Sequence, residues 1–211
     1  MKNVLNTGAS IITNFGCDVG CIYCIWKQHP LNACYTTIEH TDWNKLRDFI
    51  APYHKISVSG GGDPFYNYNT NKYWFDILCG MYNGNIDIHT SKILSNNELQ
   101  RFNKIVIHFN YERFKTSIKQ LKTINNPLRI VFVITKSLTK SQINDIIEET
   151  DKIKCQVSFR ELYNNTIDTV EINNYIKSRI TGLDQIMLVK QGDYNKYFMP
   201  DNNVWDRFMK G

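Results

Sequence analysis

The 211-residue sequence lacks any apolar run approaching the roughly 20 residues needed to span a bilayer. Its first residues, Met1–Gly8, are too polar for a secretory signal. It also lacks a run of five or more lysines and arginines. The net charge of +5 therefore indicates a solvated surface and does not demand a nucleic-acid partner. We expect a cytoplasmic protein without membrane contact.

There is no low-complexity linker and no sign of a second hydrophobic domain. Short β-branched runs alternate with amphipathic stretches. The expected strands are Ala9–Thr13, Lys55–Ser59, Asn85–Thr90, Lys104–Phe109, Leu128–Thr135 and Ile153–Phe159. The expected helices are Thr41–Ala51, Tyr73–Tyr82, Ser95–Phe102, Tyr111–Ile124, Thr139–Thr150 and Asp168–Ile180. This alternation predicts an α/β fold with parallel strands, either an open doubly wound sheet or an incomplete barrel, with its chemistry on loops at the carboxyl ends of the strands.

The tail differs in character from the rest. Gln185–Lys190 is strand-like, and Tyr197–Met199 is a candidate return strand. We therefore expect a core domain over residues 1–182 and a small β-extension over 183–211. This extension would close the core or contact substrate.

Three of the six cysteines lie within eight residues, at the spacing C-x3-C-x2-C: Cys17, Cys21 and Cys24. Clustered cysteines bind metal more often than they form disulfides in an intracellular chain. Three thiolates on one loop can hold three irons of a cubic iron–sulfur cluster and leave the fourth iron open to a small molecule. A zinc site is the alternative, with His29 or Cys34 as a fourth ligand, although zinc sites usually show a second ligand pair.

The triplet resembles the C-x3-C-x-φ-C pattern of the radical S-adenosylmethionine (SAM) superfamily, in which φ is aromatic and is Tyr23 here. The resemblance covers about residues 9–160 and implies a partial (β/α)6 TIM-like barrel with a small C-terminal β-extension. It implies that Cys17, Cys21 and Cys24 bind a [4Fe–4S] cluster, that SAM chelates the fourth iron, and that Tyr23 lies near the adenine. The reduced cluster would then split SAM into methionine and a 5′-deoxyadenosyl radical that takes hydrogen from a substrate.

A glycine triplet follows the second expected strand, in Gly60-Gly61-Gly62-Asp63. Glycines let a backbone approach a ligand closely, although such a triplet alone is usually only a turn. The run looks like the family's GGE motif, whose backbone binds the amino group of SAM. Asp63 stands where Glu is commoner, which puts a direct side-chain contact in doubt.

Further SAM contacts are expected by the same resemblance at the ends of later strands. Thr90 and Ser91 are candidates for the ribose or carboxylate, or else cap the next helix. Lys92 would pair with the carboxylate or stay solvated. The remaining candidates, all near the ribose or adenine, are Asn110, Val133 and Phe159.

Substrate contacts are less clearly marked. His108 is one candidate, although a lone histidine is more often structural. Arg160 and Glu161 would reach substrate or pair with each other. Aromatic residues of the tail would form a wall for a substrate or pack in the core: Tyr194, Tyr197, Phe198 and Trp205.

The resemblance predicts an enzyme with a small-molecule or nucleotide-like substrate, with 7-carboxy-7-deazaguanine synthases as one compact group. It also predicts a reducing partner such as flavodoxin or ferredoxin. Glycyl-radical-enzyme activases and peptide-modifying enzymes remain alternatives, as does a non-enzymatic metal-binding interaction protein. No second cysteine cluster occurs, which argues against auxiliary clusters, and we expect Cys34, Cys79 and Cys155 to be buried thiols.

Overall fold

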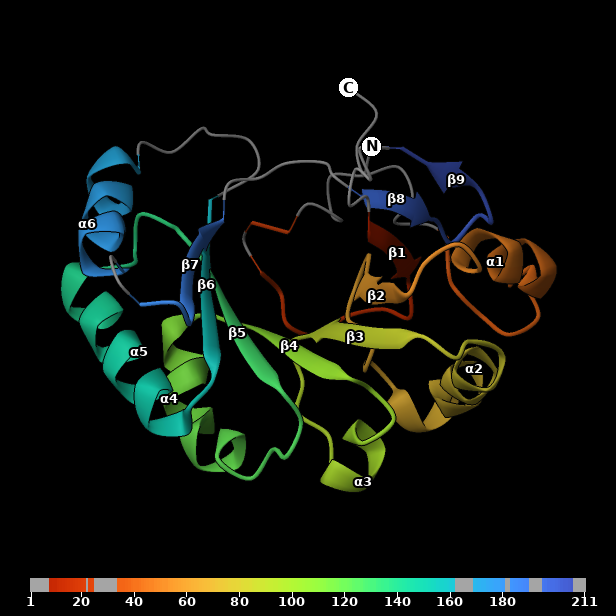
Figure 1. The fold of residues 1–211 in the computed structure, drawn as a ribbon, viewed down its shortest axis with the longest axis horizontal. Helices are drawn as coiled ribbons and strands as arrows, with labels where there is room; N and C mark the ends of the chain where they lie inside the picture. The colour runs from red at the N-terminus through yellow and green to blue at the C-terminus, as the bar shows by residue number, and fades with distance from the viewer. Residues whose placement is uncertain are drawn as a thin grey trace, which may run out of the picture. The chain divides into compact units, whose positions relative to one another are not determined.

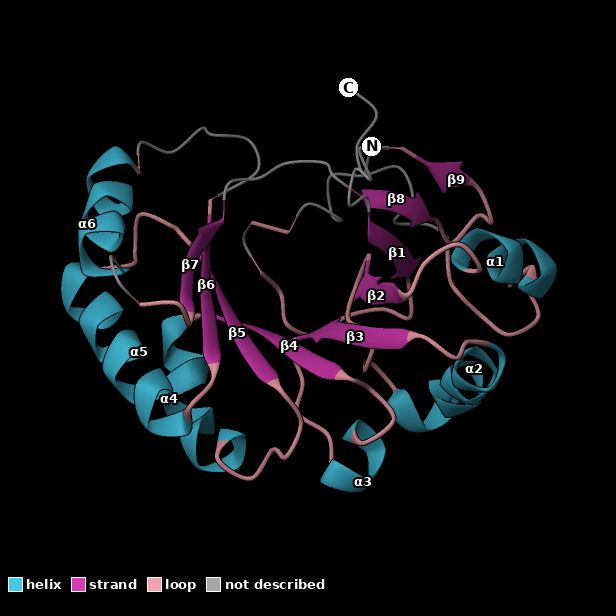
Figure 2. Cartoon of the chain, in the orientation of Figure 1, coloured by secondary structure: helices cyan, strands magenta, loops and turns pink. Residues whose placement is uncertain are grey.

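The computed structural model describes residues 8–21, 23–24, 34–161, 169–180, 183–189 and 195–206. The chain divides into two compact units, one built from residues 1–94, 101–103 and 192–211 and the other from 95–100 and 104–191. Both units consist of parallel strands with helices between them (Figures 1 and 2). None of the helices in the described ranges combines the length and apolar character that crossing a bilayer requires.

The strands of the first unit run in the order β3-β2-β1-β8-β9. Their bounds are β1 (Gly8–Thr13), β2 (Lys55–Gly60), β3 (Asn85–Thr90), β8 (Asn195–Phe198) and β9 (Val204–Trp205). All pair in parallel except β9, which lies antiparallel on β8. The helices are α1 (Trp43–Ile50) and α2 (Tyr68–Met81). The β1–β2–β3 order brings the loops after three successive strands to the same end of the sheet.

Aromatic rings fill the core of this unit. Phe75 on α2 meets Trp74, Phe15 and Phe65 in edge-to-face contacts with centroids 5.3–6.0 Å apart. Phe15 lies two residues before the first cysteine of the triplet, and Phe65 lies two residues after Asp63. These buried rings therefore anchor both predicted site loops to α2, because each ring removes a large apolar area from water.

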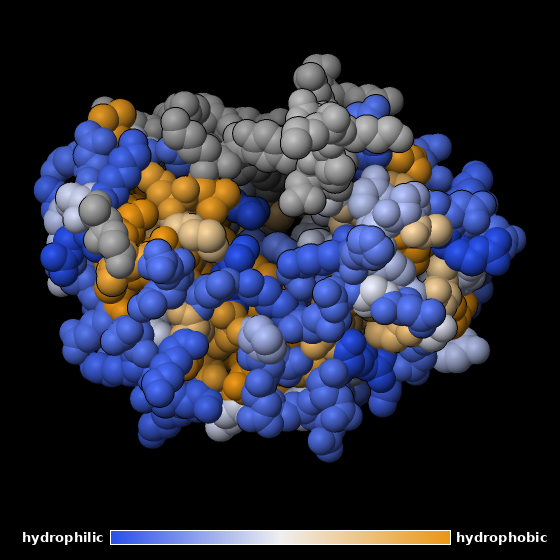
Figure 3. All heavy atoms as spheres, in the orientation of Figure 1, coloured by the Kyte–Doolittle hydropathy of each residue, from blue (hydrophilic) through white to orange (hydrophobic). Residues whose placement is uncertain are grey.

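The second unit has four parallel strands in the order β7-β6-β5-β4. Their bounds are β4 (Lys104–Phe109), β5 (Leu128–Val133), β6 (Gln156–Arg160) and β7 (Ile186–Val189). The helices are α3 (Asn96–Leu99), α4 (Tyr111–Leu121), α5 (Lys140–Ile153) and α6 (Val170–Ile180). Helices α4, α5 and α6 cover one face of these strands (Figure 1). Apolar residues gather over β6 and β7 in Figure 3, where Met187, Leu188 and Val189 are half-buried.

Several predicted boundaries are wrong. Strand β6 begins at Gln156, not Ile153, because α5 continues to Ile153 and ends on Lys154 in the left-handed conformation, at φ 59°. Helix α2 begins at Tyr68, five residues before the predicted start, and β5 ends at Val133. A capping box begins α3, where the Ser95 backbone N–H donates to the Glu98 carboxylate at 3.1 Å.

The tail forms strands close to the predicted ones, but they belong to different units. Strand β7 pairs in parallel with β6 in the second unit. Strand β8 pairs in parallel with β1 in the first unit, where the Asn195 amide donates to Ser10 Oγ at 2.9 Å. The division into a core over 1–182 and an extension over 183–211 stays a prediction.

Candidate functional site

The cysteine triplet lies on the loop that follows β1. Gly16 and Gly20 both have positive φ there, at 101° and 66°. A Cβ on Gly16 would lie 2.7 Å from the Tyr66 ring, so only glycine fits at this turn. Cys17 is exposed, whereas Cys21 and Cys24 are half-buried. The loop thus begins against a packed ring and presents its first thiol to solvent.

The thiols are free and, in this structure, not gathered. Partial desolvation raises the pKa of the Cys17 thiol, and the negative charges of Asp63, Cys21 and Asp18 add to the effect. The Val19 N–H, which donates to the Cys17 sulfur at 3.4 Å, acts in the opposite direction. Within the part of the chain described, no three His, Cys, Asp or Glu side chains are close enough to hold a metal ion. Three thiols on one loop are nevertheless the donor set that an iron–sulfur cluster takes. The residues fit such a group in kind, and the loop must close around it to bring all three sulfurs together.

The zinc alternative needs a fourth ligand, for which His29 and Cys34 are the candidates. His29 lies outside the described residues. Cys34 is half-buried and packs, as Cys24 does, against the buried pair Ile12 and Met199. The Cys34 carbonyl accepts the Asn14 side-chain amide. A short segment after the loop is thereby fixed beside the end of β1.

The glycine loop after β2 is bonded directly to the cysteine loop. The Gly61 N–H donates to the Thr13 carbonyl at 2.5 Å, and the Asp63 N–H donates to the Gly16 carbonyl at 2.8 Å. A Cβ on Gly62 would lie 2.3 Å from the Gly16 carbonyl oxygen. Glycine at 62 is therefore required by the approach of the two backbones, whatever ligand they hold.

Asp63 binds the loops of all three strands together. Its side chain is buried, with the residue 2% exposed. Its carboxylate accepts the Thr90 hydroxyl at 2.7 Å, the Ser91 N–H at 2.5 Å and the Phe65 N–H at 2.8 Å. These are charge-assisted bonds, which are stronger than neutral ones. Asp63, Thr90 and Ser91 thus come together, with the aspartate engaged by the protein itself, and their contact with SAM stays a prediction.

Lys92 completes the contacts around the cysteine loop. Its Nζ lies 2.8 Å from Asp18 Oδ2 and 5.1 Å from the centroid of the Tyr66 ring. Its backbone N–H donates to Thr90 Oγ1 at 2.9 Å. The expectation of a solvated lysine is wrong, because this side chain pairs with the loop between Cys17 and Cys21. Sequence reasoning missed Asp18, whose partner is 74 residues away.

The candidates at the end of β4, His108 and Asn110, lie in the second unit. The Asn110 side chain caps α4 by accepting the Arg113 N–H at 2.9 Å. His108 is half-buried, and desolvation, followed by the charge of Arg160, lowers its pKa to about 3. His108 is therefore neutral at pH 7 and can both donate and accept a hydrogen bond.

The candidates on β5 and β6 divide between core and strand end. Phe159 is fully buried and stacks on Phe132, with centroids 5.9 Å apart, which places it in the apolar core. Val133 is half-buried and is the register partner of Arg160. Glu161 accepts the Asn173 amide at 2.9 Å. None of these contacts tests a role in binding SAM or substrate, which stays a prediction.

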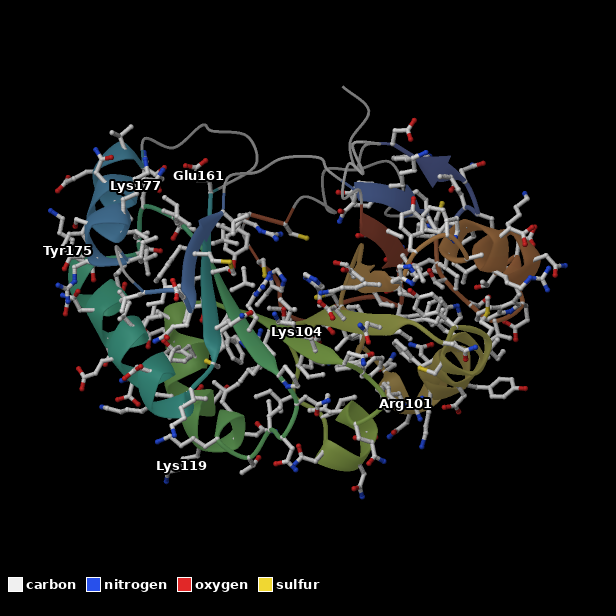
Figure 4. The ribbon with its side chains drawn as sticks, in the orientation of Figure 1. Arg101, Lys104, Lys119, Glu161, Tyr175 and Lys177 are labelled. Carbon is white, nitrogen blue, oxygen red and sulfur yellow. The ribbon has the colours of Figure 1, made fainter. Side chains whose placement is uncertain are left out.

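A cavity of about 340 Å³ lies at the other end of these strands. Lys104, Leu128 and Gln156 line it, together with Asp151 and Lys154. Lys104 begins β4, whereas Glu161 follows the end of β6 (Figure 4). The amino ends of parallel strands in such folds serve stability rather than chemistry. We therefore do not place the active site in this cavity.

The remaining predicted site residues lie in the first unit or outside the described residues. Tyr197 and Trp205 pack with Cys24 against Ile12 and Met199. Phe198 contacts Phe49, with centroids 5.7 Å apart. Tyr194 lies outside the described residues, and Tyr23 is half-buried on the cysteine loop. Tyr197 thus shares an apolar cluster with one of the three thiols.

The other cysteines differ in burial. Cys155 is buried, which raises the pKa of its thiol to about 12, so it is a protonated core thiol as predicted. Cys34 and Cys79 are only half-buried. Burial also raises the pKa of Cys79.

Comparison with protein-family models and with curated protein sequences finds no match. Solved structures do match. SuiB of Streptococcus suis bound to S-adenosylmethionine superposes with a TM-score of 0.70 at 14% identity, over 96% of this chain and 58% of SuiB. SuiB bound to the precursor peptide SuiA gives a TM-score of 0.69 at 14% identity, over 95% of this chain and 59% of SuiB. The chain spans less than two thirds of SuiB. At this identity the likeness shows the fold, and it confirms the predicted α/β class with a partial TIM-like barrel.

Proposed function

We propose that this protein is a radical SAM enzyme. One observation carries the proposal: the C-x3-C-x2-C loop follows β1, and the glycine loop after β2 is hydrogen-bonded both to the last residue of β1 and to Gly16 at the start of the cysteine loop. The fold likeness to SuiB, a protein whose structure holds SAM, supports it. We propose Cys17, Cys21 and Cys24 as ligands of a [4Fe–4S] cluster. When bound together, cluster and SAM would supply a one-electron cleavage of SAM and a hydrogen abstraction from substrate.

The chain's own residues would hold the cysteine loop and the glycine loop in a fixed relative position. The Thr13, Gly16 and Asp63 contacts connect the cysteine loop to the glycine loop, and Thr90 connects both to the end of β3. Thr13, Asn14, Asp63 and Thr90 are buried, so this polar network excludes water from its base. A preorganised site of this kind can orient SAM without rearrangement at the moment of reaction. We propose the backbone of Gly60–Asp63, with Thr90 and Ser91, as the SAM-facing part.

Two substrate classes remain as proposals. A small or nucleotide-like substrate is the class that the sequence resemblance favours. A peptide substrate is favoured by a specific observation, since the matching SuiB was solved with a precursor peptide. We also propose a flavodoxin- or ferredoxin-like electron donor and a cytoplasmic location, where the six free thiols stay reduced.

Anaerobic reconstitution tests the reaction class. We expect about four irons per chain, heat of SAM binding by calorimetry, and 5′-deoxyadenosine on reduction with dithionite. Cys21→Ala should abolish the cluster and SAM cleavage. Cys79→Ala is the matched control, because this half-buried thiol lies on α2 and should leave both intact. One equivalent of zinc and no heat of SAM binding would contradict the proposal.

The substrate class is tested separately on the reconstituted enzyme. The yield of 5′-deoxyadenosine is measured with the SuiA peptide and with a tetrahydropterin as probes. Stimulation by the peptide alone supports a peptide substrate, and stimulation by the pterin alone supports a small one.

A further inference from the structure

The segment between Cys17 and Cys21 is the most exposed part of the cysteine loop. Cys17, Asp18 and Gly20 are exposed. A Cβ on Gly20 would meet nothing within 4 Å. An exposed stretch containing glycine has wide conformational freedom, and holding it in one conformation costs entropy. Some contact must offset that cost if the thiols at both its ends are to be held in place for one ligand.

Lys92 supplies such a contact from the loop after β3. Its ammonium pairs with Asp18, the residue directly after Cys17, at 2.8 Å. The ammonium also lies over the Tyr66 ring, and that ring packs where Gly16 allows it. At its other end, the Lys92 backbone N–H is bonded to Thr90, whose hydroxyl is bonded to Asp63. The lysine is therefore fixed at its base and at its tip.

These contacts close a ring. The Gly16 carbonyl accepts the Asp63 N–H, and the Asp63 carboxylate accepts the Thr90 hydroxyl. Thr90 Oγ1 in turn accepts the Lys92 N–H. The Lys92 ammonium pairs with Asp18, which is two residues from Gly16. Most links in this ring involve buried groups. The Lys92–Asp18 link is the partly exposed one, with side chains 28% and 57% exposed. It is the link that reaches the segment between the first two thiols.

We propose that Lys92 is a positioning residue for the cysteine loop: by its ion pair with Asp18 it holds the segment between Cys17 and Cys21 against the scaffold and slows loss of the bound metal group. This inference rests on the proposed function and deepens it. A partly exposed ion pair changes a local equilibrium only about 1.5- to fivefold, so the pair acts on loop order rather than on global stability. The pair anchors one part of the loop while the rest closes around the metal group, and ordering that part in advance lowers the entropy cost of binding.

Hydrogen exchange on the metal-free protein tests the positioning directly. Lys92→Met should speed amide exchange at residues 18–21 by about 1.5- to fivefold. Lys92→Arg should restore the wild-type rate, because guanidinium also pairs with a carboxylate. The matched control is Lys55→Met, which removes the 2.6 Å pair with the buried Asp87 on the strands, away from this loop. It should leave exchange in the loop unchanged.

A double-mutant cycle on the iron-loaded protein completes the test. Lys92→Met and Asp18→Asn should each speed removal of iron by a chelator by about 1.5- to fivefold, and the double variant should be no faster than either single one. Unchanged exchange and iron retention in Lys92→Met would overturn the inference. Additive effects in the double variant would also overturn it. Weaker SAM binding with unchanged loop exchange would overturn it too, because Lys92 would then be a SAM ligand. If the wild-type protein takes up no iron, the proposed function fails, and the exchange experiment still decides whether Lys92 orders the loop.

Discussion

The strand ends of the first unit and those of the second use similar polar residues in opposite ways. After β1, β2 and β3, Asp63, Thr90 and Lys92 bond to one another and to the cysteine loop. After β4 and β6, Asn110 caps a helix and Glu161 bonds to Asn173 on α6. The first set joins three loops to one another, whereas the second set secures single helices. We therefore place the candidate site where the polar bonds join different loops.

The largest expected effect comes from removing the shared carboxylate. Asp63→Ala leaves the Phe65 N–H, the Thr90 hydroxyl and the Ser91 N–H without their acceptor. Buried donors without partners are costly, so we expect a loss of about 3 kcal/mol in the free energy of unfolding. Asn110→Ala, which removes one helix cap, should cost about 1 kcal/mol. Urea unfolding followed by circular dichroism measures both, and equal losses would erase the contrast between the two sets.

A smaller effect is expected from the glycine that lets the two loops meet. In Gly62→Ala the new methyl group would lie 2.3 Å from the Gly16 carbonyl oxygen. Separating the loops should cost about 1–3 kcal/mol of stability and weaken SAM binding, as measured by thermal unfolding and calorimetry. Gly80 is an exposed position of α2 where an added Cβ meets nothing within 4 Å, so Gly80→Ala should stabilise by about 0.5–1 kcal/mol. Full SAM affinity in Gly62→Ala would show that the loops need not touch.

The smallest expected effect concerns His108 in the second unit. Its pKa is lowered to about 3 in the folded state, mainly by desolvation. Since the unfolded histidine binds a proton below its usual pKa of about 6.5, stability is fully present above that pH and is lost as pH falls towards about 3. The loss from this group between pH 6.5 and pH 5 is at most about 2 kcal/mol, because the side chain is only half-buried. His108→Gln should flatten the pH dependence of urea unfolding over this range, and an unaltered profile would contradict the lowered pKa.

Strand and helix order followed from the sequence because apolar periodicity reports directly on which residues are buried. The boundary at β6 did not, because α5 continues its buried stripe of Ile143, Ile146 and Thr150 and then ends on Lys154, a non-glycine residue at positive φ. Nothing local signals such an ending. The pairing of β8 with β1 was also hidden, since it joins residues about as far apart as Ser10 and Asn195.

The candidate site was predictable only where a local sequence pattern marks it. The cysteine spacing and the glycine triplet are local patterns, so both loops could be located. The use of Asp63 as an acceptor for Thr90 and Ser91, and the pairing of Lys92 with Asp18, depend on contacts over 27 to 74 residues. Single residues such as Asp18 carry no pattern that distinguishes a partnered carboxylate from a solvated one. Phe159 shows the converse, because its place in the strand pattern fits a core position as well as a ligand contact.

Electron paramagnetic resonance of the reduced, reconstituted protein tests the three-thiolate site most directly. If Cys17, Cys21 and Cys24 are the only protein ligands, one iron is open and the spectrum of the cluster should change when SAM is added. A spectrum that SAM leaves unaltered, from a protein that carries its full complement of iron, would contradict the account.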